Sequence, residues 1–173
     1  MSDQEAPLRY LTKRMNNMSG MNYWQRLRMC NLQSTERRNQ RYRVLYTWKS
    51  LNDLVPSLGL STSNDQRKGR LIVIPKNTGT VQRIKTLKDK SIQRTGARLF
   101  NRLPRIIRDY EGEYQGFKEL VDTFLDTIPD CPCLPGYQTH NLDNTGRQSN
   151  SIVDWCRNMK TDGWIPNATS NKG

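Results

Sequence analysis

The chain has 173 residues, of which 34% are hydrophobic, and it carries 28 lysines and arginines against 16 aspartates and glutamates. This length excludes a large multidomain enzyme, and the low apolar content allows only a small hydrophobic core. We therefore expect one basic helical domain over residues 19–128, preceded by a flexible N-terminus over 1–18. A poorly ordered tail is expected over 129–173.

Positive charge is concentrated in the middle of the chain. Residues 61–110 contain 13 basic and 3 acidic side chains, whereas 111–173 contain 5 basic and 9 acidic ones. Such an excess favours a polyanionic partner, chiefly RNA or DNA. No apolar run is long enough for a membrane span, and the first residues lack a signal-peptide pattern. We expect an intracellular protein, nuclear or cytoplasmic and not secreted, with neither a membrane partner nor a small-molecule ligand.

In the first half of the chain, apolar spacing predicts helices before any strand. Residues 1–18 support at most a short helix, and 22–32 form a short amphipathic one. The strongest helical period covers 34–55, with Ser34 or Thr35 as the N-cap and Pro56 as the end. A mobile loop is expected over 57–69. Residues 71–74 then form a strand, and 81–87 form either its hairpin partner or a helix.

In the second half, Gly96 allows a turn or close packing, and a helix over 97–103 is ended by Pro104. A clear helical face covers 117–125, and a short helix is expected near 151–159. The fold class is thus mainly α, a short helical bundle with disordered ends in which one β-hairpin is an alternative. Its core is expected to comprise Leu45, Trp48, Leu51, Val55, Leu99, Phe100, Leu103, Ile106, Phe117, Leu120, Phe124 and Leu125.

The acidic residues do not form a catalytic pattern. Polymerases need carboxylates brought together to hold divalent metal ions, and this chain has no adjacent aspartate pair. Asp53, Asp65, Asp89 and Asp109 stand singly among basic residues, as expected for surface ion pairs. Zinc binding by Cys131, Cys133, His140 and Cys156 is an alternative to free thiols, but the spacing is poor. We therefore predict no catalytic residue, no metal site and no cofactor in this chain.

Clustered cations are the feature with the clearest physical partner, because cations that neutralise phosphates release counterions. A solvated charged surface is the alternative. Tyr42 could stack on bases, whereas Tyr46 and Trp48 have the spacing of core residues. Phosphate contacts are expected from Arg37, Arg38, Arg41, Arg43, Arg83, Lys85, Lys88, Lys90 and Arg94.

Several segments, in order along the chain, resemble the C-terminal region of reverse transcriptases from LINE-type (non-LTR) retrotransposons. The most specific is Leu-Phe-Asn-x-Leu-Pro-x-x-Ile-Arg, at residues 99–108. The resemblance covers roughly residues 20–160. The other matching segments are Tyr23-Trp-Gln-Arg-Leu27, Leu32-Gln-Ser-Thr-Glu-Arg-Arg38, the helix from Tyr42 to Pro56, Arg70-Leu-Ile-Val-Ile-Pro75, the full stretch 91–108 that contains the most specific segment, Phe117-Lys-Glu-Leu-Val-Asp-Thr-Phe-Leu125, Ile128-Pro-Asp130 and Asn150-Ser-Ile-Val-Asp-Trp155.

The resemblance implies a piece downstream of the fingers and palm, in or beyond the thumb, that helps hold RNA and DNA. The parent RNA-directed DNA polymerase would use Mg²⁺ and would supply the missing N-terminal part as a partner. No catalytic residue of the family transfers to a position here, so we expect no polymerase activity from this chain alone. The alternatives are a degenerate remnant of such an element and a protein-interaction module of the host.

Overall fold

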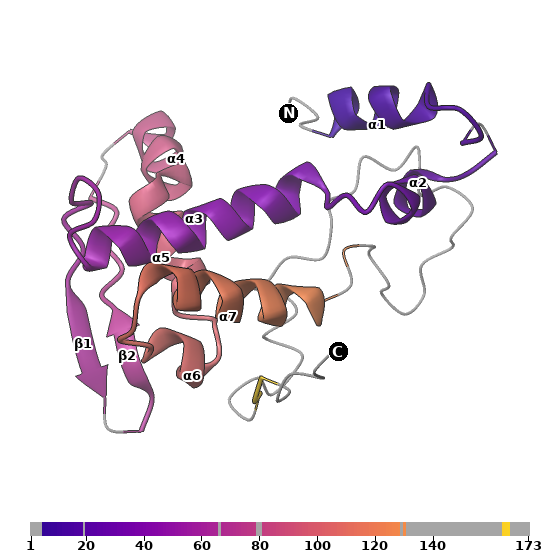
Figure 1. Cartoon of the computed structure of the whole chain (residues 1–173). Helices are drawn as coiled ribbons and strands as arrows, with labels where there is room; N and C mark the ends of the chain where they lie inside the picture. Colours follow the sequence, from indigo (N-terminus) through magenta and orange to yellow (C-terminus); the bar gives the residue numbers. More distant parts are fainter. Residues whose placement is uncertain are drawn as a thin grey trace. The chain divides into compact units, whose positions relative to one another are not determined.

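The computed structural model describes residues 5–18, 20–65, 67–78, 81–128, 130 and 164–166. Over these residues the chain is mainly helical, as expected, with a single two-stranded antiparallel sheet (Figure 1). The elements are α1 (Ala6–Lys13), α2 (Tyr23–Met29), α3 (Thr35–Leu51), β1 (Thr62–Asp65), β2 (Gly69–Ile72), α4 (Gln82–Lys90), α5 (Ile92–Phe100), α6 (Arg105–Arg108) and α7 (Tyr114–Asp126).

The chain divides into two compact units. Unit 1 comprises Met1–Asn39 and Ile128–Ser151, and unit 2 comprises Gln40–Thr127 and Ile152–Gly173. Helix α3 starts in unit 1 and ends in unit 2. The expected helix near 151–159, and the expected tail apart from residues 130 and 164–166, lie outside the described residues.

In unit 1, a small apolar cluster holds α1 and α2 together. Tyr23, Trp24 and Leu27 are buried, with Leu8 packed against them. Helix α2 begins with a reciprocal cap, since Asn22 Oδ1 accepts from the backbone of Gln25 while the side chain of Gln25 accepts from the backbone of Asn22. This arrangement satisfies two amide groups that a helix start leaves open, so the helix predicted over 22–32 is confirmed in a shorter form.

The N-terminus of α3 binds two carboxylates from distant parts of unit 1. Glu5 accepts hydrogen bonds from the backbone N–H groups of Thr35 and Glu36, and from the Tyr23 hydroxyl. Asp130 accepts from the backbone and the hydroxyl of Ser34. Both anions lie where the helix dipole favours negative charge. Ser34 Oγ also accepts from the Arg37 backbone, which confirms Ser34 as the N-cap.

The core of unit 2 forms where α3 packs against α7. Trp48 stacks on Phe117 with ring centroids 4.7 Å apart. Of the expected core residues, those that are buried are Leu45, Trp48, Leu99, Phe100, Leu103, Phe117, Phe124 and Leu125.

The core prediction was wrong at four positions. Ile106 is 44% exposed, and its neighbour Ile107 is buried instead. Helix α6 is a separate turn that starts after Pro104, so the period of α5 does not continue through it. Leu51, Val55 and Leu120 are only partly buried.

The backbone at the C-terminal end of α3 determines where the helix stops. Asp53 adopts a left-handed conformation, and Leu54 N–H donates to Lys49 O, so the helix ends at Leu51, before the predicted Pro56.

Along the helix, Thr47 faces α5 at Gly96. A Cβ on Gly96 would overlap the Thr47 hydroxyl. The close-packing interpretation of this glycine is therefore confirmed.

The hairpin consists of β1 and β2, with Thr62 opposite Ile72 and Asp65 opposite Gly69. The prediction of a loop over 57–69 is wrong at β1, and the alternative strand over 81–87 is helix α4. The polar segment Thr62-Ser-Asn-Asp65 pairs through its backbone, which its side chains do not reveal.

The end of α5 fastens this hairpin to the helices. The Asn101 side chain accepts from Ile72 N–H and donates to Ile72 O, both at 2.8 Å. Arg108 donates to the carbonyl oxygens of Arg70 and Leu103. The segments quoted above as 70–75 and 91–108 are thus joined by hydrogen bonds.

Replacing Asn101 with alanine leaves both backbone groups of Ile72 without this partner, so we expect unfolding free energy to fall by about 1–3 kcal/mol. Chemical denaturation followed by circular dichroism measures this change. The adjacent, exposed Arg102→Ala is the matched control and should change stability by less than about 0.5 kcal/mol. Equal effects of the two substitutions would contradict a fastening role for Asn101.

Candidate nucleic-acid interface

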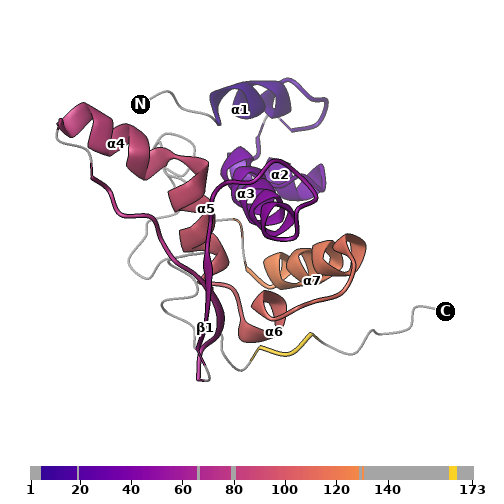
Figure 2. The same cartoon turned by 90° about the vertical axis from the view of Figure 1, so that its left-hand side faces the viewer.

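Helix α4 is the most solvent-exposed helix of unit 2 that the structure describes. None of its residues is buried, and it carries Arg83, Lys85, Lys88 and Lys90 on its surface. Figures 1 and 2 both show α4 extending from the start of α5, away from the hairpin and α7. Four of the nine predicted phosphate-binding residues therefore lie on one exposed helix of nine residues.

Asp89 is the single acidic residue of α4, and it faces α5. Its Oδ1 lies 2.9 Å from Arg94 Nε and 3.6 Å from Arg98 Nη2. Asn77 on the preceding segment donates to Lys85 O, and Arg94 donates to Pro75 O. These contacts fix which side of α4 faces the rest of unit 2. The one carboxylate of the helix is thus directed to two arginines of α5.

Ser91 separates α4 from α5 and connects their ends. Its hydroxyl donates to Lys88 O, and the same oxygen accepts from Arg94 N–H as the N-cap of α5. Because one residue ends the first helix and starts the second, the cations of α4 are held next to those of α5.

The predicted residues on α3 lie in other environments. Arg37 is 1% exposed, with its Nε 3.7 Å from Asp130 Oδ1 in unit 1. Arg41 forms a bidentate ion pair with Asp122 in unit 2, with Nε 2.5 Å from Oδ1 and Nη2 2.7 Å from Oδ2. The hydrogen bond to Asp122 raises the pKa of Arg41 above its usual value. Arg38 is exposed, and Arg43 is partly buried.

The nine predicted residues thus do not form one surface. The structure brings Arg83, Lys85, Lys88 and Lys90 together on α4, whereas Arg94, at the start of α5, is paired with Asp89. On α3, two of the four predicted arginines are used in ion pairs within the fold.

Sequence reasoning missed that the apolar residues of α4 are exposed. Val81, Ile84 and Leu87 are 56%, 44% and 62% exposed. The spacing of positions 81, 84 and 87 is also that of a helix face packed on a core, so the sequence alone does not reveal this exposure.

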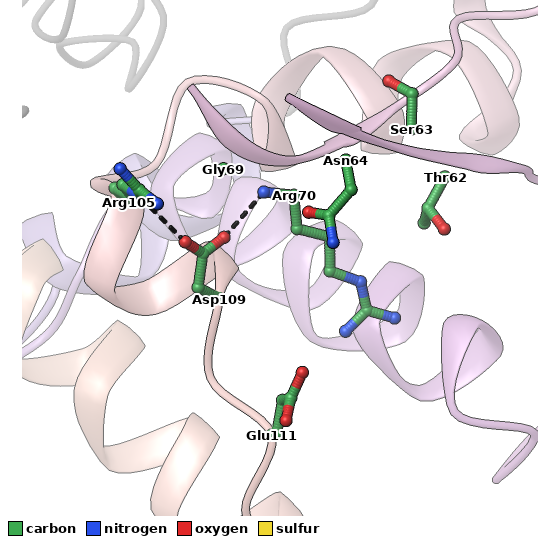
Figure 3. A pocket seen from close by; sticks show the side chains of 8 residues that line it. All are labelled: Thr62, Ser63, Asn64, Gly69, Arg70, Arg105, Asp109 and Glu111. Carbon is green, nitrogen blue, oxygen red and sulfur yellow. Dashed lines mark hydrogen bonds and ion pairs between the residues drawn. The ribbon is translucent and has the colours of Figure 1, made fainter. Parts of the chain in front are cut away.

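A second surface feature is a polar cavity of about 520 Å³ between the hairpin and the end of α6. Figure 3 shows Asp109 between Arg105 and the Arg70 backbone nitrogen, at 2.9 and 2.7 Å. Two arginines and two carboxylates, Asp109 and Glu111, line this cavity. Its charges balance, so it offers no net attraction to phosphate, and we leave it outside the interface.

Asp109 also fixes the start of β2. Gly69 has a positive φ, and a Cβ there would overlap the Asp109 carboxylate. Burial alone would raise the pKa of Asp109, but the hydrogen bonds from Arg70 N–H and Arg105 and the nearby arginine charges outweigh it, so the pKa is lowered.

In the part of the chain that the structure describes, no helix is long and apolar enough to cross a membrane. Within the same residues, no three His, Cys, Asp or Glu side chains gather where they could hold a metal ion. The alternative zinc ligands Cys131, Cys133, His140 and Cys156 lie outside the described residues.

Comparisons with protein-family models, curated proteins and solved structures found no match for this chain. The geometry by itself defines a class by fold only: over the described residues, the protein is mainly helical, with a small hairpin and an exposed basic helix.

Arg41→Gln removes the ion pair between α3 and α7, and we expect it to lower unfolding free energy by about 1 kcal/mol, since both groups are partly solvated. Arg38→Gln, on the same helix but exposed, is the control and should be neutral to within about 0.5 kcal/mol. Thermal or denaturant unfolding measures both. Equal stability of the two variants would show that the Arg41–Asp122 pair contributes nothing to the fold.

Folding lowers the pKa of Asp109. Its ionised form therefore stabilises the folded protein at pH values above the pKa that Asp109 has in the unfolded chain, about 3.9. This contribution disappears as pH falls through the lower, folded pKa. We therefore expect wild type to exceed Asp109→Asn in unfolding free energy at neutral pH, with the gap closing below about pH 4. Denaturant titrations at several pH values measure the gap, and a constant gap would refute the assignment.

Proposed function

We propose that this chain binds the phosphate backbone of RNA or DNA without reading its sequence, and that α4 with the start of α5 is the contact surface. The observation that carries the proposal is the exposure of Arg83, Lys85, Lys88 and Lys90 on a helix that buries no side chain. A helix serving only the fold would bury an apolar face.

Charge distribution supports the same partner. The segment 61–110 has 13 basic against 3 acidic residues, and two of those acids, Asp89 and Asp109, are already paired with arginines of the fold. The cations of α4 therefore keep their positive field. Phosphate contacts made through such a field position a nucleic acid but carry no sequence information.

The resemblance described above motivates a larger proposal. In it, this chain is the post-palm region of a LINE-type reverse transcriptase, acting inside the cell on RNA and DNA together with the catalytic part of the protein. Its contribution would be to hold nucleic acid, because the paired aspartates of a polymerase centre are not in its sequence.

The test is fluorescence anisotropy of the full chain with labelled oligonucleotides at several salt concentrations. Lys85→Gln with Lys88→Gln should weaken binding and reduce the slope of log K against log salt by about 1–2. The slope falls because a phosphate contact that is no longer made releases no counterions.

The matched control removes the same charge from unit 1, through Lys13→Gln with Arg28→Gln, which are both exposed. It should bind nearly as wild type. Equal weakening by the two double variants would mean that net charge alone drives association. Absence of binding at low salt would reject the proposed function altogether.

A further inference from the structure

The apolar side chains of α4 form a row along its exposed side. Val81 stands at the N-cap, and Ile84 and Leu87 follow at three-residue steps, so the three project from neighbouring positions. We call these three residues the α4 apolar row. Each is between 44% and 62% exposed.

The row points away from α5 and the rest of unit 2. Asp89, which pairs with Arg94 and Arg98 of α5, lies five residues after Ile84 and two after Leu87. At about 100° per residue these steps place Asp89 on the opposite side of the helix from Ile84 and Leu87. Asp89 faces α5, so the α4 apolar row faces solvent.

Cations border the row on both sides. Arg83 lies four residues before Leu87, on one border of the row, and Lys90, three residues after Leu87, continues the line of the row at its C-terminal end. Lys85 and Lys88 stand four residues after Val81 and Ile84, on the other border. The exposed side of α4 is therefore an aliphatic strip with positive charge on both borders and at its C-terminal end.

A duplex matches only half of this surface. Its phosphates would meet the cations, but its bases are stacked inside and leave the apolar row in water. An unpaired strand presents both groups, since its phosphates can reach the flanking cations while unstacked bases cover the aliphatic side chains.

We infer that α4 binds single-stranded nucleic acid in preference to duplex, with the α4 apolar row against unpaired bases. This inference rests on the proposed function and specifies the nucleic acid that the same surface takes. A protein partner is less well matched, because three aliphatic side chains on a nine-residue helix are small beside a stable protein interface. An anionic membrane also calls for a broader apolar face.

The experiment compares one labelled oligonucleotide, single-stranded and annealed to its complement, at equal salt with the full chain. Wild type should bind the single strand about tenfold more tightly, which is the effect of removing roughly 60 Å² of apolar surface from water. Ile84→Gln with Leu87→Gln should remove this preference while leaving duplex affinity and the salt slope unchanged. Glutamine keeps a high helix propensity, and α4 buries no residue, so the variant retains the fold.

The control is Leu11→Gln with Leu54→Gln, two leucines of similar exposure outside α4. It should keep the single-strand preference. Equal binding of both forms by wild type, or equal weakening of both by the α4 variant, overturns the inference and leaves backbone binding standing. No binding of either form rejects the proposed function itself, and binding only to vesicles of anionic lipid would redirect α4 to a membrane surface.

Discussion

The ion pair between Asp89 and α5 is the contact on which the functional account depends. Asp89 is the one acid of α4, and its contacts with Arg94 and Arg98 direct it toward unit 2. The pair is partly exposed, so its contribution to stability is small. Its importance is geometric, because the pairing directs the one acid of α4 toward arginines of α5, on the side of the helix away from Ile84 and Leu87. Ser91 and Asn77 hold the same orientation through backbone contacts.

Ion pairing also decides which cations of the chain remain available. Asp122 and Asp130 pair with Arg41 and Arg37 in their respective units. These acids come from far along the chain, with Arg41 and Asp122 81 residues apart. A helical wheel of α3 places Arg37, Arg38 and Arg41 on one polar face and cannot show that distant carboxylates meet two of them. The number of cations therefore overstates the surface that can attract phosphate.

Periodicity predicted the elements that local pattern determines. Helices α2, α3 and α7 were found because each has apolar residues at three- to four-residue steps. Strand β1 was missed because Thr62-Ser-Asn-Asp65 has turn-forming residues and becomes a strand only through pairing with β2. The end of α3 was misplaced because Asp53 takes a left-handed conformation that no pattern announced. At the candidate interface, the residue types on α4 were predictable, but the exposure of its apolar residues depends on packing.

The segments that carry the resemblance make contacts of the fold. Asn101 and Arg108, both within the most specific segment, hold β2 against the helices. Helix α4 lies between two of the quoted segments and belongs to neither. The exposure and charge of α4 therefore support backbone binding independently of the resemblance, which concerns the segments that pack around it.

Amide chemical-shift mapping of the full chain with a single-stranded oligonucleotide tests the central claim most directly. The account predicts the largest shifts over residues 81–98, on α4 and the first turns of α5, with little change over 5–37. Shifts centred on unit 1, or spread evenly over all basic residues, would contradict α4 as the contact surface.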